Sequence, residues 1–292
     1  MSPLFDSSKE EKELKITFYS KEAIHCPICD ASFYREELLS GGGRLIAGPL
    51  TDELHRIYEP SAKYGDVHPL VYSATVCPSC WFASSDTDFS AVPEKVRPDI
   101  SADREARIAD TQSIFTNIDF SGARTLEDGA ASQYLALRCY GFYTKEFSPT
   151  LKQGMSALRA AWLFDELHKK SPTENFDWLS LLFKRKACFL YHEAILKEQS
   201  GKEPLSGVKN FGPDSDKNYA YEGALYLVAL LESKYGDKND PEKRLAALAD
   251  AKRSIAKIFG LGKSSKAKPG PLLEKARNLY DDLNKELNET DD

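Results

Sequence analysis

The sequence of 292 residues is first informative for what it lacks. No stretch approaches the roughly 20 consecutive apolar residues that cross a bilayer as a helix, so we expect no membrane insertion. The first 20 residues contain no apolar run of the length found in signal peptides. We therefore expect a cytoplasmic protein. In that compartment thiols stay reduced, and the six cysteines are expected to be metal ligands or buried thiols rather than disulfides.

Recognisable catalytic motifs are also absent. No Ser–His–Asp arrangement and no pair of carboxylates stands out among the 45 acidic residues. The segment FGLGKSS at 259–265 ends like a phosphate-binding loop. However, Lys257 stands where the first glycine of that motif belongs, and the segment follows a helical pattern rather than a strand. We therefore expect that the protein is not an enzyme.

Basic charge is scarce in the first third of the chain. Residues 1–95 carry 9 Lys and Arg against 15 Asp and Glu, a difference equal to the whole net charge of −6. Zinc modules that grip phosphates are usually basic, so nucleic acid is not the partner we expect. The segment 251–268 has six cations and no acid, and weak nucleic-acid binding there is an alternative. A solvated helix end followed by a loop is the simpler interpretation.

The sequence does contain one motif twice, as HCPICD at 25–30 and VCPSCWF at 76–82. A CPxC turn aims two sulfurs at one point, and two such turns supply the four ligands of tetrahedral zinc at about 2.3 Å. Strand patterns precede both turns, in LKITFYS at 14–20 and HPLVYSATV at 68–76. Four thiolates fill the coordination sphere, which is typical of a structural site. We predict a structural zinc ion bound by Cys26, Cys29, Cys77 and Cys80.

Iron is the alternative metal, because rubredoxin-like centres use the same pair of turns and would make the protein an electron carrier. Rubredoxins usually have glycine after the second cysteine of each turn, whereas Asp30 and Trp81 stand here, which favours zinc. His25, His55 and His68 lie near or between the turns and could each replace a cysteine, but four cysteines already suffice.

Residue 98 marks a change to helical patterns. Apolar residues recur at three- to five-residue steps, as in Leu151, Met155, Leu158 and Trp162. Helical segments are expected at 99–117, 126–146, 148–170, 175–201, 216–237, 240–260 and 270–287. The predicted fold class is α+β, mostly α: a β-rich, zinc-ribbon-like module at 1–95, then an array of antiparallel helix hairpins, similar to tetratricopeptide repeats, at 96–292. The surface of such an array is expected to bind a protein partner.

Residues 24 to roughly 200 resemble a bacterial family known as domain of unknown function 2225. The similarity lies in CPICDASF, in KYGDVHPLVYSATVCPSCWFAS and in the helical LRAAWLFDEL. The resemblance implies a cytoplasmic zinc-ribbon protein with tetratricopeptide-like helices. It also implies that the four cysteines of the two turns are the metal ligands, and it transfers no catalytic residue. The chain departs from the family pattern at Asp30, at Trp81 and in its glycine-rich loop at 41–49.

Overall fold

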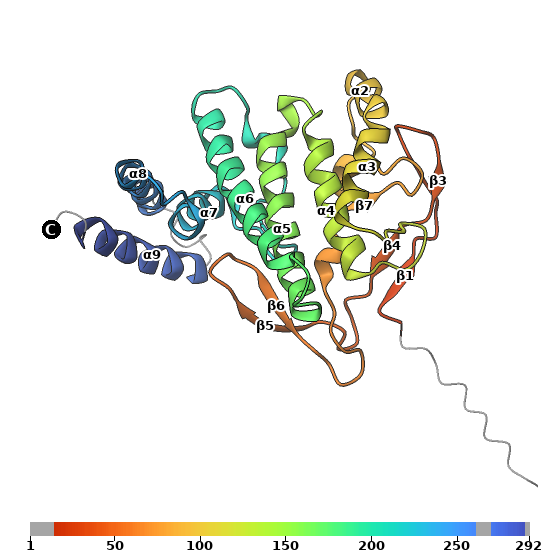
Figure 1. Cartoon of the computed structure of the whole chain (residues 1–292), viewed down its shortest axis with the longest axis horizontal. Coiled ribbons are helices and arrows are strands. Elements are labelled where there is room, and N and C mark those ends of the chain that lie inside the picture. The colour runs from red at the N-terminus through yellow and green to blue at the C-terminus, as the bar shows by residue number, and fades with distance from the viewer. Residues whose placement is uncertain (1–14, 261–269, 290–292) are drawn as a thin grey trace, which may run out of the picture.

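The computed structural model describes residues 15–260 and 270–289. This part of the chain is mostly helical, and its strands form only short antiparallel pairs, so the predicted α+β, mostly-α fold class is confirmed. Helices α4 (Leu126–Tyr140), α5 (Pro149–Lys170) and α6 (Phe176–Gln199) lie side by side in the middle of the molecule. Most of the strands lie at one end and the last helices at the other (Figure 1).

The strands form four separate two-stranded ladders, all antiparallel. In chain order the pairs are β1 (Thr17–Tyr19) with β4 (Glu36–Leu38), β2 (Ile24–His25) with β3 (Ser32–Phe33), β5 (Ile46–Leu50) with β6 (Arg56–Glu59), and β7 (Thr75–Val76) with β8 (Ala83–Ser84). Ladders this short are marginal alone. Their stability depends on the packing around them and on interactions that hold the turns between the strands in place.

Two expectations for the N-terminal part need correction. The predicted strand at 68–76 is a 3-10 helix, η1 (Pro69–Tyr72), and only Thr75–Val76 is strand. Its proline fixes φ and lacks a backbone donor, which suits a first helical turn better than a ladder. The glycine-rich loop is also shorter than 41–49. Gly42 and Gly43 turn with φ of 70° and 75°, and β5 begins at Ile46.

Each predicted helical segment contains a helix in the structure, but the first is split in two and the helix expected at 126–146 ends at Tyr140. The remaining elements are α1 (Asp86–Phe89), η2 (Glu94–Val96), α2 (Arg97–Ala102), α3 (Arg104–Ile114), η3 (Lys145–Phe147), η4 (Leu205–Gly207), α7 (Ala220–Tyr235), α8 (Pro241–Gly260) and α9 (Gly270–Glu289). A capping box opens α4, in which Thr125 and Asp128 satisfy each other's backbone N–H groups. No helix within the described ranges is long and apolar enough to cross a bilayer.

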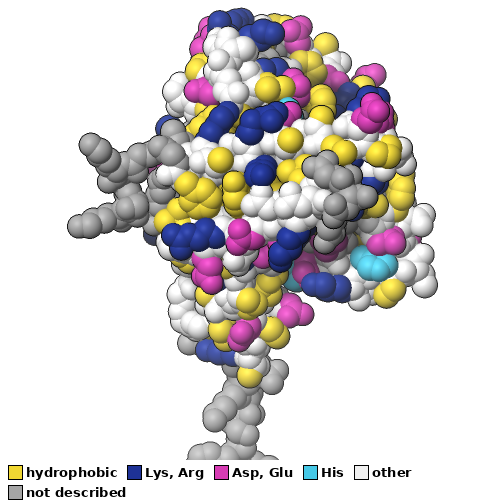
Figure 2. Space-filling view, turned by 90° about the vertical axis from the view of Figure 1, so that its left-hand side faces the viewer, with side chains coloured by type: hydrophobic (Ala, Val, Ile, Leu, Met, Phe, Trp, Pro, Cys, Tyr) yellow, Lys and Arg dark blue, Asp and Glu magenta, His cyan; other side chains and the backbone are white. Residues whose placement is uncertain are grey.

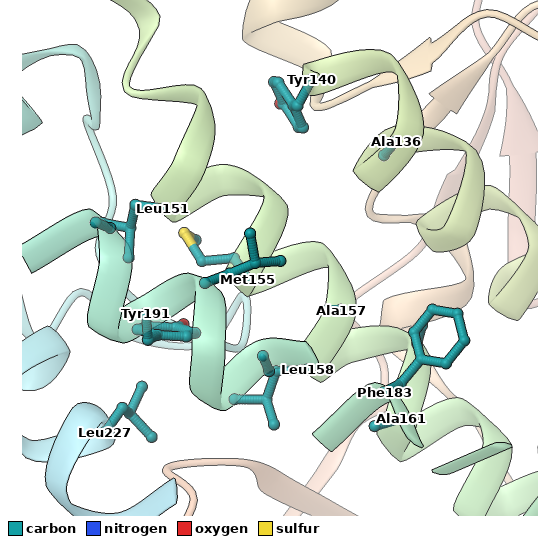
Figure 3. Close-up of a cluster of buried hydrophobic side chains, with 14 of the residues drawn as sticks. Ala136, Tyr140, Leu151, Met155, Ala157, Leu158, Ala161, Phe183, Tyr191 and Leu227 are labelled. Carbon is teal, nitrogen blue, oxygen red and sulfur yellow. The ribbon is translucent and has the colours of Figure 1, made fainter. Parts of the chain in front are cut away.

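From α4 to α9, each long helix packs against the next one in sequence. Neighbouring helices can approach α5 closely because the side chains of Ala157, Ala160 and Ala161, which are fully buried there, are small. Leu158 of α5, Tyr191 of α6 and Leu227 of α7 lie in the buried cluster shown in Figure 3. The arrangement is a chain of helix hairpins; its likeness to tetratricopeptide repeats stays a prediction.

One hydrophobic cluster runs from the cysteine turns into the helices. It includes Phe82 and Phe89 from the N-terminal third together with Leu135 of α4 and Phe164 of α5. The contact between η1 and α4 is close, since a Cβ on Gly129 would lie 2.8 Å from Val71 Cγ2. The segments on either side of the second cysteine turn, η1 and β8, are therefore packed onto α4. The predicted division into domains at residues 95 and 96 stays a prediction.

Candidate metal centre

Both CPxC turns have the same backbone geometry. Cys26 N donates to Ala31 O at 2.9 Å, and Asp30 N donates to Cys26 O at 3.0 Å. The second turn repeats this pattern, because Cys77 N donates to Phe82 O and Trp81 N donates to Cys77 O, both at 2.9 Å. Each turn connects the two strands of a ladder, β2 with β3 and β7 with β8. The sequence thus builds one hydrogen-bonded turn twice.

Each turn ends in a left-handed residue. Asp30 and Trp81 both have φ of 57°, a conformation that glycine adopts most easily. The departure from the rubredoxin pattern therefore leaves the backbone conformation unchanged. The lack of glycine at these positions, which the sequence analysis took to favour zinc, does not distinguish zinc from iron.

The two turns face each other and bring four sulfurs together. The Sγ atoms of Cys26, Cys29, Cys77 and Cys80 all lie within 4.8 Å of one another. Across the two turns, Cys26 Sγ is 3.6 Å from Cys80 Sγ, and Cys29 Sγ is 3.6 Å from Cys77 Sγ. A tetrahedral ion with metal–sulfur bonds of about 2.3 Å requires sulfurs roughly 3.8 Å apart, whereas a disulfide needs about 2.05 Å. The arrangement fits a four-coordinate metal ion.

Hydrogen bonds within the sulfur cluster move the pKa values of its thiols apart. Hydrogen bonds with the thiols of Cys26 and Cys80 lower the pKa of Cys77. The hydrogen bond to Cys77 raises the pKa of Cys26, and hydrogen bonds with Cys26 and Cys77 raise the pKa of Cys80. The cluster by itself therefore favours one thiolate shared among neighbouring thiols. A divalent cation is what stabilises several thiolates in such a space, because coordinated thiols are deprotonated.

Burial also suits a structural centre. Cys26, Cys77 and Cys80 are buried, and Cys29 is partly exposed. Four sulfurs around one ion leave no position for water or a substrate. Among the described residues, these four cysteines are the one group of three or more Cys, His, Asp and Glu side chains close enough to share an ion.

An arginine of α3 fastens the second turn, and sequence reasoning missed it. Arg107 is fully buried. Its Nη2 and Nε donate to Cys80 O at 2.7 and 3.2 Å, and its Nη1 donates to Ile100 O at 2.8 Å. Nearby, Arg104 Nη2 donates to Ser79 O at 2.8 Å. The sequence offers no signal for this role, because the burial of Arg107 and Thr111 on α3 becomes visible only in the structure.

None of the three histidines joins the sulfur cluster. His25 Nδ1 lies 2.9 Å from Ser32 Oγ on the exposed side of the β2–β3 ladder. His55 stacks on Trp162 with ring centroids 4.2 Å apart, and its Nδ1 lies 2.6 Å from Asp214 Oδ2. Burial lowers the pKa of His68, which lies outside the sulfur cluster.

Only part of the basic segment 251–268 can be placed, because residues 261–268 lie outside the described residues. Within α8, Lys252 Nζ lies 5.6 Å from the ring centre of Tyr280, and Arg253 pairs with Asp250 on the same helix. Both cations thus have neighbours within the protein. Nucleic-acid binding at this segment stays an untested alternative.

Comparisons with known proteins cover nearly the whole chain. A family model described as "Uncharacterized protein conserved in bacteria (DUF2225)" matches residues 19–283. An uncharacterized protein of Borreliella burgdorferi is 43% identical over 274 residues, which is 94% of this chain and 98% of that protein. No solved structure matches the chain.

Proposed function

The chain belongs to the bacterial family DUF2225, as its sequence resemblance predicted, and from this premise we propose that it is a cytoplasmic, non-enzymatic interaction protein. Neither description names an activity, so the proposal rests on this chain's own residues. A structural zinc ion at the four cysteines holds the N-terminal turns against the helices, and the outer face of α6 binds a protein partner.

Zinc is proposed because a closed, largely buried set of four thiolates is typical of structural zinc sites. Its role is mechanical: each CPxC turn is linked to short ladders that cannot hold themselves in place. A metal joining residues about 50 positions apart restricts the unfolded chain and contributes on the order of 10 kcal/mol of folding free energy. Iron at the same sulfurs, in an electron carrier, is the alternative.

The exposed face of α6 is the observation that carries the partner function. Half of the exposed large hydrophobic side chains in the described ranges are on this one helix: Trp178, Leu181, Leu182, Phe189 and Leu196. At 3.6 residues per turn, these five positions fall within an arc of about 100°. Single exposed apolar residues are ordinary, but a continuous patch on a monomer marks an interaction surface.

A groove continues this face towards α7. A cavity of about 610 Å³ lies between Phe189 and His192 on α6 and Tyr235 at the end of α7. Arg185 and Lys186 are exposed between Leu182 and Phe189, and they form no ion pair with any residue the structure describes. An amphipathic helix would complement both features with acidic residues opposite Arg185 and Lys186 and apolar residues over the groove, whose own acidic side chains disfavour further acids there.

Hydrophobic side chains are also exposed on the side of α8 and α9, in small areas separated by Lys and Arg side chains (Figure 2). They are scattered among charges of both signs. We therefore place the partner on α6, where the apolar positions follow a single helical face.

A photo-crosslinking side chain placed at Trp178 in growing cells tests the proposal. We expect a discrete adduct with another protein, and we expect Phe189→Glu, three helical turns further on, to abolish it. Tyr34→Glu is the matched control, because Tyr34 is 58% exposed against 59% for Phe189 but lies outside α6. No adduct, an adduct insensitive to Phe189→Glu, or an adduct of two copies of this chain would overturn the proposal.

A further inference from the structure

A second cavity lies where the segment after the second cysteine turn meets the helices, away from both the sulfurs and the α6 face. Its volume is about 330 Å³, near the lower end of the roughly 300–1,000 Å³ of small-molecule sites. Residues 85–88, α4, α5 and the loop at 207–215 line it. Ala136, Tyr140 and Met155, labelled in Figure 3, form its apolar part.

Hydroxyl and amide groups dominate the polar lining of this cavity. They belong to Ser73, Ser85, Thr87, Ser156, Ser215, Gln133 and Asn210. Ser156 is 3% exposed, and its Oγ makes no hydrogen bond with the residues that the structure describes. Gln133 is 1% exposed and donates from Nε2 to Ser73 Oγ at 2.9 Å, while its Oε1 has no donor within those residues.

Neither atom is among the buried, unpaired side-chain atoms of the described residues, so both are accessible from the cavity, where a ligand hydroxyl can replace water as their hydrogen-bond partner. Ser156 Oγ can donate or accept, and Gln133 Oε1 accepts. A polyol satisfies both, because each of its hydroxyls is a donor and an acceptor. A purely apolar molecule of the same size would leave both groups unpaired.

The charges of the lining select an anion. Both acids are already paired: Asp88 Oδ2 lies 2.6 Å from Lys152 Nζ, and Asp86 Oδ2 lies 2.7 Å from Arg35 Nη1. Two lining cations have no carboxylate partner among the described residues. Arg159 donates from Nε to Pro213 O at 2.6 Å and from Nη2 to Gly212 O at 3.4 Å, and Lys209 is exposed.

This charge pattern differs from that of the groove beside α6, whose lining includes Glu193, Glu232 and Asp237. A cationic cavity on a chain of net charge −6 concentrates small anions locally. Arginine and lysine bind phosphate oxygens through charge-assisted hydrogen bonds.

We propose that this cavity binds a sugar phosphate, with the phosphate at Arg159 and Lys209 and the sugar hydroxyls at Ser156 and Gln133. The site is independent of the partner surface on α6. It joins the N-terminal segment, two central helices and the 207–215 loop, so an occupied cavity stabilises the contact among all of them.

Isothermal titration calorimetry of the full zinc-loaded chain with glucose 6-phosphate, glycerol 3-phosphate, inorganic phosphate and glucose tests this. We expect at least one sugar or polyol phosphate to bind at least about tenfold more tightly than phosphate or glucose, which each make half of the contacts. The proposal is wrong if none of these compounds binds, or if inorganic phosphate binds as tightly as both organic phosphates.

Two variants locate the site. Lys209→Gln should weaken the tightest-binding phosphate about tenfold, the usual effect of losing one charge-assisted hydrogen bond. Lys238→Gln makes the same charge change at an exposed lysine outside the cavity and should leave affinity unchanged. Ser156→Ala should weaken the sugar phosphate but not inorganic phosphate. Equal losses in the two lysine variants would mean non-specific charge attraction and would overturn the assignment.

Discussion

Replacing Arg107 with Met tests how the metal centre is joined to the helices. The substitution keeps an unbranched, buried side chain but removes the donors that hold Cys80 O and Ile100 O. Cys80 is 1% exposed, so its carbonyl has no ready access to water after the change. The turn that supplies two of the four sulfurs would keep only the hydrogen bond from Arg104 to Ser79 O as a side-chain bond from α3.

The magnitude follows from the number and kind of these bonds. Hydrogen bonds to a charged group contribute about 1.5–3 kcal/mol each, and removing one partner of a buried charged network costs about 3–5 kcal/mol. Arg107 Nη1 also lies 3.3 Å from Asp103 Oδ2, but Asp103 keeps its ion pair with Arg138 at 2.5 Å, so the destabilisation from losing that contact is small. Removing a buried guanidinium also recovers part of its desolvation cost. We expect the free energy of unfolding to fall by about 3 kcal/mol.

Urea unfolding followed by circular dichroism measures that loss, and competition with a chromophoric chelator measures zinc affinity. If about half of the loss falls on the cysteine turn, the Kd for zinc rises about tenfold. Arg104→Met is the matched control, because Arg104 is exposed and donates only to Ser79 O. An Arg107→Met protein that keeps both its stability and its zinc affinity would refute the reasoning.

Three further changes probe other parts of the account. Cys77→Ser removes one ligand and should abolish zinc binding and unfold the N-terminal module, while circular dichroism keeps most of the helical signal; a collapse of helicity would contradict the division at residues 95 and 96. Asp214→Asn should cost about 1–2 kcal/mol at pH 7. Burial raises the pKa of Asp214, but hydrogen bonds from His55 and backbone N–H groups outweigh it and lower the pKa below 3.8. In pH-dependent denaturation, the deficit should therefore persist above about pH 4 and shrink as the pH falls through that lowered pKa; a constant deficit would refute this origin. Gly129→Ala, which brings a methyl group against Val71, should lower stability by about 1–3 kcal/mol in thermal melts; an unchanged melting temperature would show that this contact is loose.

The long helices were predictable because local signals and burial agree there. Apolar residues on α5 recur with the helical period, and Gly201, just beyond the end of α6, turns with φ of 68° as a helix terminator does. The segment at 69–72 was not predictable in the same way. Its Leu, Val and Tyr side chains favour a strand, but Pro69 and packing against α4 impose a 3-10 turn.

The functional sites also include features that were predictable from the sequence and features that were not. One CPxC turn supplies only half of a tetrahedral site, so the repetition of the motif was sufficient to predict which four cysteines meet, although the two turns are about 50 positions apart. Arg107 and the pairing of His55 with Asp214 were not predictable, because their contacts join residues 27 and 159 positions apart. The exposed face of α6 could not be predicted from the sequence for a different reason. That helix is apolar on several sides, and only packing decides which side remains open.

The metal content of the untagged protein, measured by mass spectrometry with an absorbance spectrum of the same sample, tests the central claim most directly. The account predicts one zinc ion per chain and no visible absorption band, as four thiolates around a d¹⁰ ion require. Iron with a visible band would contradict the structural zinc centre and favour an electron carrier. Protein that folds and binds no metal would contradict any metal centre at these four cysteines.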